Sequence, residues 1–267
     1  MNSVAQKTLF ETYRVNAFQG FRPPDWRDLG WSAYSQHDED GYLLYIFSAL
    51  GFNTRRVVEV CCGNGRESNT ANLLLNHRCT GALFEGSEAL ATVARQFYSE
   101  HSATAFWPPA IVCDWITAEN IDGLITEAGI VGDIDLLSID IDGIDYWLWD
   151  RIGVISPRVV VAEINHLWGA DESVTVPYAP DFKAVFTQYG SDYAGASIAA
   201  FVKLGHRKGY RLVGGNAIGT NAFFVRNDLV HPWLPEVHAD TLFWHPRSKF
   251  GQSVRIEGVR SMDWERV

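Results

Sequence analysis

Short apolar runs alternate along this chain with stretches in which apolar residues recur at helical spacing. Apolar runs without alternation are typical of strands buried on both faces of a parallel sheet. Helical patterns between such runs are typical of the crossovers that join parallel strands. We predict strands over 55–62, 80–86, 110–114, 133–141 and 157–165. Helices are predicted between them over 66–77, 87–100, 117–128 and 146–152.

The pattern differs at the two ends of this core. Helices are expected over 4–18 and from Asp38 to Leu50, the second with Ser35 as a cap and Gly51 as its stop. After 166–192, which has no clear period, we expect a helix over 194–208. Two strands joined by a Gly/Asn turn then follow, over 210–214 and 221–226.

This order of elements predicts an α/β fold, with a doubly wound, mostly parallel, seven-stranded sheet and an N-terminal helical arm. We divide the chain into an arm or lid (1–34), a cofactor-binding domain (35–229) and a tail packed on that domain (230–267). The unpatterned stretch 166–192 is expected to be functional, because long irregular segments in compact domains usually are.

Composition narrows the class of protein. The chain has 267 residues and a net charge of -10, which argues against sequence-independent binding to nucleic acid. No apolar run approaches the length of a membrane span, and the first residues lack the layout of a signal peptide. The four cysteines form no CxxC pair, which favours reduced thiols in a cytoplasmic protein over a zinc site or a disulfide framework.

Polar residues stand at the ends of five predicted strands. They are found over 59–65, at Glu85, at Asp114, at Asp140 and over 163–166. In open parallel sheets, ligands bind beyond the carboxyl ends of the strands. The coincidence therefore predicts a single site at that edge.

The turn after the first strand indicates which cofactor the site holds. It reads VVEVCCGNG over 57–65, without the third glycine of a dinucleotide fingerprint, and Glu59 would repel a pyrophosphate. Glu85 is placed to bind both hydroxyls of a ribose, and Asp114 to accept a hydrogen bond from an adenine amine. Together these acidic residues describe S-adenosylmethionine better than NAD.

The same stretch resembles the first motif of class I S-adenosylmethionine-dependent methyltransferases, written (D/E)xGxGxG. Gly63 and Gly65 match its last two glycines, Cys61 replaces the first, and Glu85 matches the acidic residue of the second motif. Residues 35–229 are similar to an FkbM-related, methyltransferase-like group through stretches such as SQHDEDGYL, LLSIDIDGIDYWLW and PRVVVAEIN. The resemblance implies that Gln36 and Glu39 touch the methionine end of the cofactor, with helix capping as the alternative for both. Asp140, at a strand end, is assigned to the same cofactor site. The resemblance also implies a small-molecule acceptor and a role in secondary metabolism.

Methyl transfer to a hydroxyl needs a group that positions the nucleophile and takes its proton. His166 is the predicted general base, and Asp140 and Tyr193 complete the predicted catalytic set. Asp140, Glu163 and Asn165 form a hard-oxygen set suited to Mg²⁺. As an alternative, these side chains cap neighbouring helices or bind the amino group of the cofactor.

Three functions remain open from the sequence. The first is methyl transfer to a small-molecule hydroxyl or similar nucleophile. The second is cyclisation or elimination of S-adenosylmethionine with release of methylthioadenosine. The third is binding without catalysis on the same fold. The sequence also leaves a homodimer open.

Overall fold

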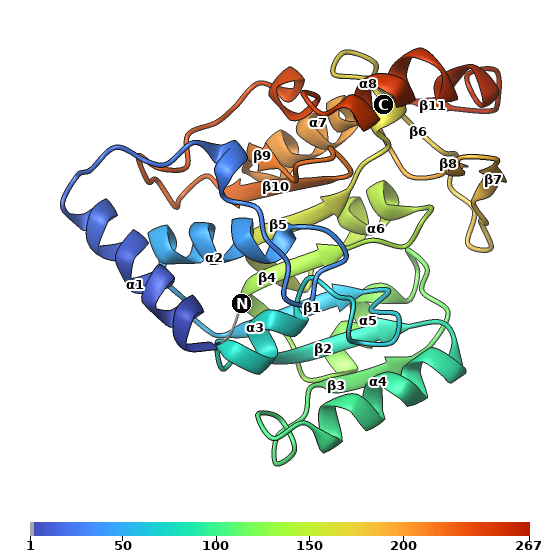
Figure 1. The fold of residues 1–267 in the computed structure, drawn as a ribbon. Helices are drawn as coiled ribbons and strands as arrows, with labels where there is room; N and C mark the ends of the chain where they lie inside the picture. The colour runs from blue at the N-terminus through green and yellow to red at the C-terminus, as the bar shows by residue number, and fades with distance from the viewer. Residues whose placement is uncertain (1–2) are drawn as a thin grey trace.

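The computed structural model describes residues 3–267, and its centre is a seven-stranded sheet of order β3-β2-β1-β4-β5-β10-β9 (Figure 1). Strands β1 to β5 are parallel, and β10 runs antiparallel to both of its neighbours. The strands are Arg56–Val60 (β1), Thr80–Glu85 (β2), Ala110–Cys113 (β3), Gly132–Ile139 (β4), Ile155–Glu163 (β5), Tyr210–Gly215 (β9) and Asn221–Arg226 (β10). The predicted fold class is confirmed.

Helices cover both faces of the sheet. They are Ser3–Phe18 (α1), Glu39–Leu50 (α2), Ala71–Asn76 (α3), Glu88–Glu100 (α4), Ile121–Glu127 (α5), Asp145–Arg151 (α6), Ile198–Lys208 (α7) and Pro246–Ser253 (α8). Side chains from α2, α3 and α4 pack on one face with Val57, and those from α5, α6 and α7 pack on the other with Val58. The side chains of successive strand residues thus point to opposite faces of the sheet and pack in different hydrophobic cores, as the pleat requires.

Shorter elements make up the rest of the chain. They are the 3₁₀ helices Trp26–Asp28 (η1), His166–Trp168 (η2), Ala239–Leu242 (η3) and Arg255–Gly258 (η4), and the strands Val174–Thr175 (β6), Val185–Thr187 (β7), Gly190–Tyr193 (β8) and Glu265–Arg266 (β11). The stretch over 166–192 therefore has structure of its own, including the hairpin of β7 and β8. No helix within residues 3–267 has the length and apolar character that a bilayer crossing needs.

The sequence overestimates the helix after β1 most. It also starts the helices predicted over 117–128 and 194–208 too early, since α5 begins at Ile121 and α7 at Ile198. We predict a helix over 66–77, but α3 begins only at Ala71. Residues 68–70 instead bond to the carboxylate of Glu59, and this holds them out of a helix. Helix propensity is a weak local preference, and a buried carboxylate that needs donors overrides it.

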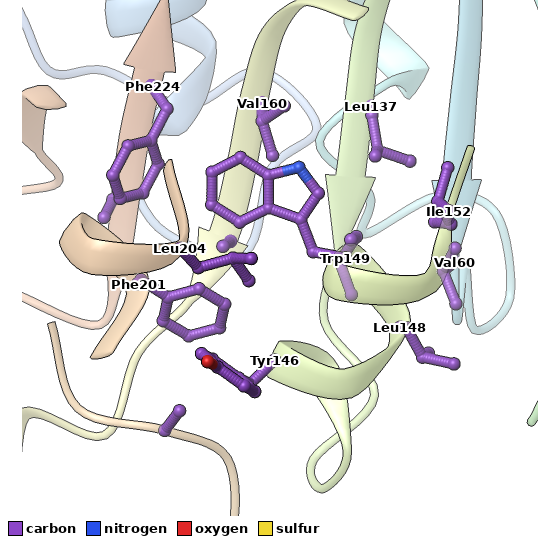
Figure 2. Close-up of a cluster of buried hydrophobic side chains, with 14 of the residues drawn as sticks. Val60, Leu137, Tyr146, Leu148, Trp149, Ile152, Val160, Phe201, Leu204 and Phe224 are labelled. Carbon is purple, nitrogen blue, oxygen red and sulfur yellow. The ribbon is translucent and has the colours of Figure 1, made fainter. Parts of the chain in front are cut away.

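Trp149 on α6 is the largest fully buried side chain of the core (Figure 2). Figure 2 shows its indole between Val160 on β5, Phe224 on β10 and Leu204 on α7. Its ring centroid lies 5.0 Å from that of Phe224 and 5.7 Å from that of Tyr210. Trp149 therefore joins the parallel part of the sheet to its antiparallel end.

Replacing Trp149 with alanine leaves a cavity at this junction, and we expect a loss of about 3–5 kcal/mol in the free energy of unfolding. Urea denaturation followed by far-UV circular dichroism measures the change. Trp107→Ala is the matched control, because Trp107 is 77% exposed. A loss for Trp149→Ala no larger than for this control would contradict the packing described.

Candidate active site at the carboxyl edge of the sheet

The turn after β1 has an unusual backbone. Cys61, Gly63 and Gly65 all have positive φ angles, of 67°, 56° and 72°. A side chain at Gly65 would lie 2.9 Å from Tyr98 and 3.0 Å from Ala94, whereas a side chain at Gly63 would meet nothing within 4 Å. Gly65 thus permits close packing on α4, and Gly63 leaves space beside its backbone.

Cys61 is the residue that departs from the methyltransferase motif, and its backbone explains why glycine is usual there. A left-handed conformation costs a residue with a side chain about 1 kcal/mol, and glycine avoids that cost. Burial, followed by the charges of Glu85 and Asp140, raises the pKa of the Cys61 thiol. The thiol is therefore protonated, and it stands between the acidic ends of β2 and β4.

Glu59 holds the turn in place. Its carboxylate accepts hydrogen bonds from the Ser68 hydroxyl at 2.6 Å, the Asn69 N–H at 2.9 Å, the Thr70 N–H at 3.2 Å and the Thr70 hydroxyl. Burial raises the pKa of Glu59, and these bonds oppose the rise. The Glu59 carboxylate thus lies against the loop over 68–70. A role of Glu59 in binding the cofactor remains a prediction.

Glu85, at the end of β2, connects two turns. One carboxylate oxygen accepts from the Gly63 N–H at 2.8 Å, and the other accepts from the Ser87 N–H at 2.8 Å. The side chain is 4% exposed. Gly63 and Glu85, predicted separately from the sequence, are therefore in direct contact.

Asp114 follows β3 and lies beside Glu85, because its N–H donates to the Glu85 carbonyl at 3.2 Å. The adjacent Trp115, which the sequence analysis did not single out, is 52% exposed, and its ring is in contact range of Gly86. Its indole N–H donates to the Pro180 carbonyl at 2.7 Å, which orients the ring. An exposed aromatic face thus stands next to Asp114.

Gln36 and Glu39 have different surroundings. Gln36 is exposed in the segment before α2. Glu39 is buried, and its carboxylate accepts from the side-chain amides of Asn216 at 2.7 Å and Asn221 at 2.8 Å. Glu39 therefore ties α2 to the turn between β9 and β10, and contact of either residue with a cofactor remains a prediction.

Four acidic residues meet at the ends of β4 and β5. Burial, followed by the charges of Asp145 and Asp142, raises the pKa of Asp140 to about 7. Burial and then the charge of Asp140 raise the pKa of Glu163 well above its ordinary value. Glu163 shares a hydrogen bond with Asp140, so the two side chains hold a proton between them.

Asp145, absent from the predicted site, fixes the loop that carries Asp140. Its carboxylate accepts from the N–H groups of Ile141 at 2.8 Å and Gly143 at 3.0 Å. Burial raises its pKa to about 6. The recurrent aspartates of SIDIDGID are the signal in the sequence that could have found this residue.

The donor set predicted for Mg²⁺ is not assembled. The Asn165 amide nitrogen donates to the carbonyls of Asp192 at 3.0 Å and Ala194 at 2.9 Å, and its oxygen accepts from the Leu167 N–H at 3.1 Å. Over residues 3–267, no group of three or more His, Cys, Asp or Glu side chains is arranged to hold a metal ion. Asp140 and Glu163 are left as a proton-sharing pair.

A cavity of about 70 Å³ lies at the end of β5, and Glu163 is the member of this pair that lines it. Its lining includes Glu163, His166, Asp192, Arg247 and Arg255. Arg255 and Asp192, both in its lining, form a buried ion pair. A water molecule occupies about 30 Å³ in the liquid, so the cavity has room for a few heavy atoms.

The two remaining predicted catalytic residues are buried. His166 lines the cavity, its Nε2 has no hydrogen-bond partner among the described residues, and burial lowers its pKa to about 4. Tyr193 packs against Phe182 and Trp264, and its hydroxyl donates to the Asp263 carbonyl. Arg247 and Arg255 come from the tail, where no pattern in the sequence pointed to a site.

Comparison with known proteins gives likenesses of fold. No family model and no curated protein matches the chain. One similar solved structure is an S-adenosylmethionine-dependent methyltransferase from Clostridium acetobutylicum, 9% identical, with a TM-score of 0.44 over 82% of this chain and 98% of that one.

Two further solved structures resemble the chain. The N-terminal domain of EvdMO1 with S-adenosylhomocysteine bound is 12% identical, with a TM-score of 0.47 over 80% of this chain and 94% of that one. Magnesium protoporphyrin IX methyltransferase from Synechocystis, with S-adenosylmethionine bound, is 13% identical. Its TM-score is 0.42, over 85% of this chain and 98% of that one. At these identities and scores the likeness carries no conclusion about what this chain binds.

The proton held by Glu163 makes stability depend on pH. Because the pKa of Glu163 is raised in the folded state, folding binds a proton that the unfolded chain releases above about pH 4.5. Stability is therefore lost as the pH rises from there toward the folded-state pKa. Glu163→Gln has no such proton. We expect its stability relative to the wild type to rise between pH 5 and 8 by up to about 1.4 kcal/mol per pH unit.

Urea denaturation at several pH values measures this difference. The control is Glu127→Gln, which changes an exposed acid on α5 and should show no pH-dependent difference from the wild type. Parallel pH profiles for the wild type and Glu163→Gln would contradict the shared proton.

Proposed function

We propose that this chain is an S-adenosylmethionine-dependent methyltransferase that acts on a small-molecule hydroxyl or similar nucleophile, in secondary metabolism. The observation that carries the proposal is the direct bond between Glu85 and Gly63 at the carboxyl edge of the sheet. It joins the two motif residues on which the sequence resemblance depends. The acidic ends of β3 and β4 flank this contact and extend the site along the same edge.

The residues present fit this cofactor. Space beside the Gly63 backbone admits a ligand, and the Glu85 carboxylate is held beside it to accept the two hydroxyls of a ribose. Asp114 would accept from the adenine amine, with Trp115 against the ring. Gln36 and Glu39 would lie toward the methionine end. When bound, S-adenosylmethionine supplies an electrophilic methyl group on a positively charged sulfur, which suits an acidic edge.

The Asp140–Glu163 pair is the best candidate to take the proton from the acceptor. A general base works best when its pKa is near the working pH. The pKa of Asp140 is raised to about 7, whereas that of His166 is lowered to about 4. We therefore place the acceptor at the end of β5, with Asp140 as the base and His166 as a wall of the cavity.

The small size of the cavity favours a second candidate. A pocket for an organic ligand usually measures about 300–1,000 Å³. The cavity beside the pair measures about 70 Å³, enough for the reacting end of an acceptor but not for its body. Cyclisation or elimination of S-adenosylmethionine needs no separate acceptor pocket, so it remains the alternative to transfer.

Cofactor binding tests the first part of the proposal. In Glu85→Gln, the charged acceptor for the ribose hydroxyls is lost. We expect S-adenosylmethionine to bind about 10-fold to 100-fold more weakly, as hydrogen bonds to a charged group contribute about 1.5–3 kcal/mol each. Calorimetry measures the change. Glu88→Gln is the control, since Glu88 is 71% exposed at the start of α4. Unchanged affinity in Glu85→Gln would refute this cofactor site.

Product analysis separates the candidate reactions. The protein is incubated with S-adenosylmethionine and a set of small hydroxylated acceptors, and the products are identified by mass spectrometry. We expect S-adenosylhomocysteine in amounts that depend on the acceptor, and much less of it in Asp140→Asn because the base is lost. Methylthioadenosine would identify the cyclase or lyase instead. Cofactor binding without either product would identify a binding protein.

A further inference from the structure

A second cavity lies at the opposite edge of the sheet, at the amino ends of β1 and β2. Its volume is about 300 Å³, and it is lined by residues of α1, of the end of α3 and of the loops that enter the two strands. Figure 1 shows α1 beside α3 at this edge. The contact is confirmed by a hydrogen bond of 3.0 Å between Gln6 on α1 and His77 after α3. This cavity and the candidate active site are separated by the length of the strands.

Two arginines of this cavity have a strained backbone. Arg55, just before β1, has a φ of 55°, and Arg78, just before β2, has a φ of 59°. They are half of the four residues other than glycine with positive φ over 3–267. Such conformations persist mainly where the surroundings impose them, and they concentrate at ligand-binding sites.

The fold explains the conformations but not the choice of arginine. Arg78 follows the end of α3, where the Cys79 N–H returns to the Leu73 carbonyl at 3.1 Å, and glycine is the usual residue at such a position. Arg55 is held because its N–H, like that of Thr54, donates to the buried Asp135 carboxylate. Glycine would relieve the strain at both positions. The Arg55 guanidinium has contacts within the fold that account for it, whereas Arg78 has no such side-chain contact among the described residues.

The charge of this cavity is uncompensated. Lys7 and Arg78 line it, and within residues 3–267 neither has an ion pair or a side-chain hydrogen bond. Its one carboxylate, that of Glu11, is paired with Arg14 at 2.6 Å. Burial, and then the charges of Arg55 and Lys7, lower the pKa of His77 to about 4, so both cations lie close to that ring. Such a cluster of positive charge stands out in a chain whose net charge is -10.

Stacked aromatic rings and the Arg55 guanidinium form the floor of the cavity. Phe10 on α1 stacks on Phe52 at 5.9 Å between ring centroids, and the Arg55 guanidinium lies 4.7 Å from the centre of the Phe52 ring. Arg55 also donates to the His77 carbonyl. A charged group fixed in this way loses little conformational freedom when a ligand binds, which favours binding.

We propose that this cavity binds a compact polyanion of the oligophosphate class, held by Lys7, Arg55 and Arg78. Arginine and lysine are the side chains that proteins use to bind phosphate, and the cavity volume is at the lower end of the range for small ligands. Lys7 lies on the N-terminal arm, and the two arginines lie on the body of the fold. A bound polyanion therefore fastens the arm to the sheet, independently of the cofactor site.

The test uses inorganic pyrophosphate as the probe, with calorimetry for affinity and thermal unfolding for stability at constant ionic strength. Arg78→Gly is the informative variant, because it relieves backbone strain while removing a charge. Without pyrophosphate, we expect its Tm to equal or exceed that of the wild type. With pyrophosphate, we expect binding at least about tenfold weaker and a smaller rise in Tm. Lys7→Gln should also weaken binding.

Arg56→Gln is the matched control, since Arg56 is an exposed arginine at the same end of β1 that does not line the cavity. It should bind pyrophosphate as the wild type does. UDP, whose base is not adenine, is the second probe. Tighter binding of UDP than of pyrophosphate assigns the cavity to nucleotides, and equal binding assigns it to free oligophosphates. The proposal is overturned if pyrophosphate does not bind, if Arg78→Gly binds it normally, or if Arg56→Gln loses as much affinity.

Discussion

Buried carboxylates that accept backbone N–H groups hold together the loops of this fold. Glu59 binds the loop over 68–70, and Asp145 binds the loop over 141–143. Asp135 accepts from the N–H groups of 53–55 and pairs with the buried Arg158 at 2.7 Å. A loop has no regular partners for its N–H groups, and each one left buried and unbonded destabilises the fold. The acidic side chains accept hydrogen bonds from these N–H groups, and in this way they fix the turns that form the candidate site.

The same constraint gives the two edges of the sheet different characters. At the carboxyl edge, acidic side chains lie so close together that the pKa values of Asp140 and Glu163 are raised. At the amino edge, Arg55 and Arg78 stand beside Lys7 without a carboxylate to neutralise all three. The strands between the edges are apolar and keep the two groups of charges apart. The two edges of the sheet thus differ in the sign of the charge that they carry.

Most of the fold follows from the order of apolar runs. The seven strands of the sheet and the helices between them appear where the sequence predicts them, because a strand buried on both faces leaves an unmistakable apolar run. The helix predicted over 66–77 is wrong in its first half, since Glu59 needs the donors of 68–70. The segment over 166–192 has no period because it forms a 3₁₀ turn and short strands that pair locally, each too brief to leave a pattern.

The sequence by itself determined the sheet, the strand ends that carry polar residues, and the positions of Gly63 and Glu85. These depend on periodicity and on local backbone requirements, which neighbours in the chain express. Only the tertiary structure decided the partner of each polar side chain. It placed the Glu85 carboxylate against the Gly63 N–H and Asp140 beside Glu163. It also directed the Asn165 amide to carbonyls of the following loop, and it paired Arg255 with Asp192. Hydrogen bonds and pKa shifts arise between residues far apart in sequence, so no local pattern records them.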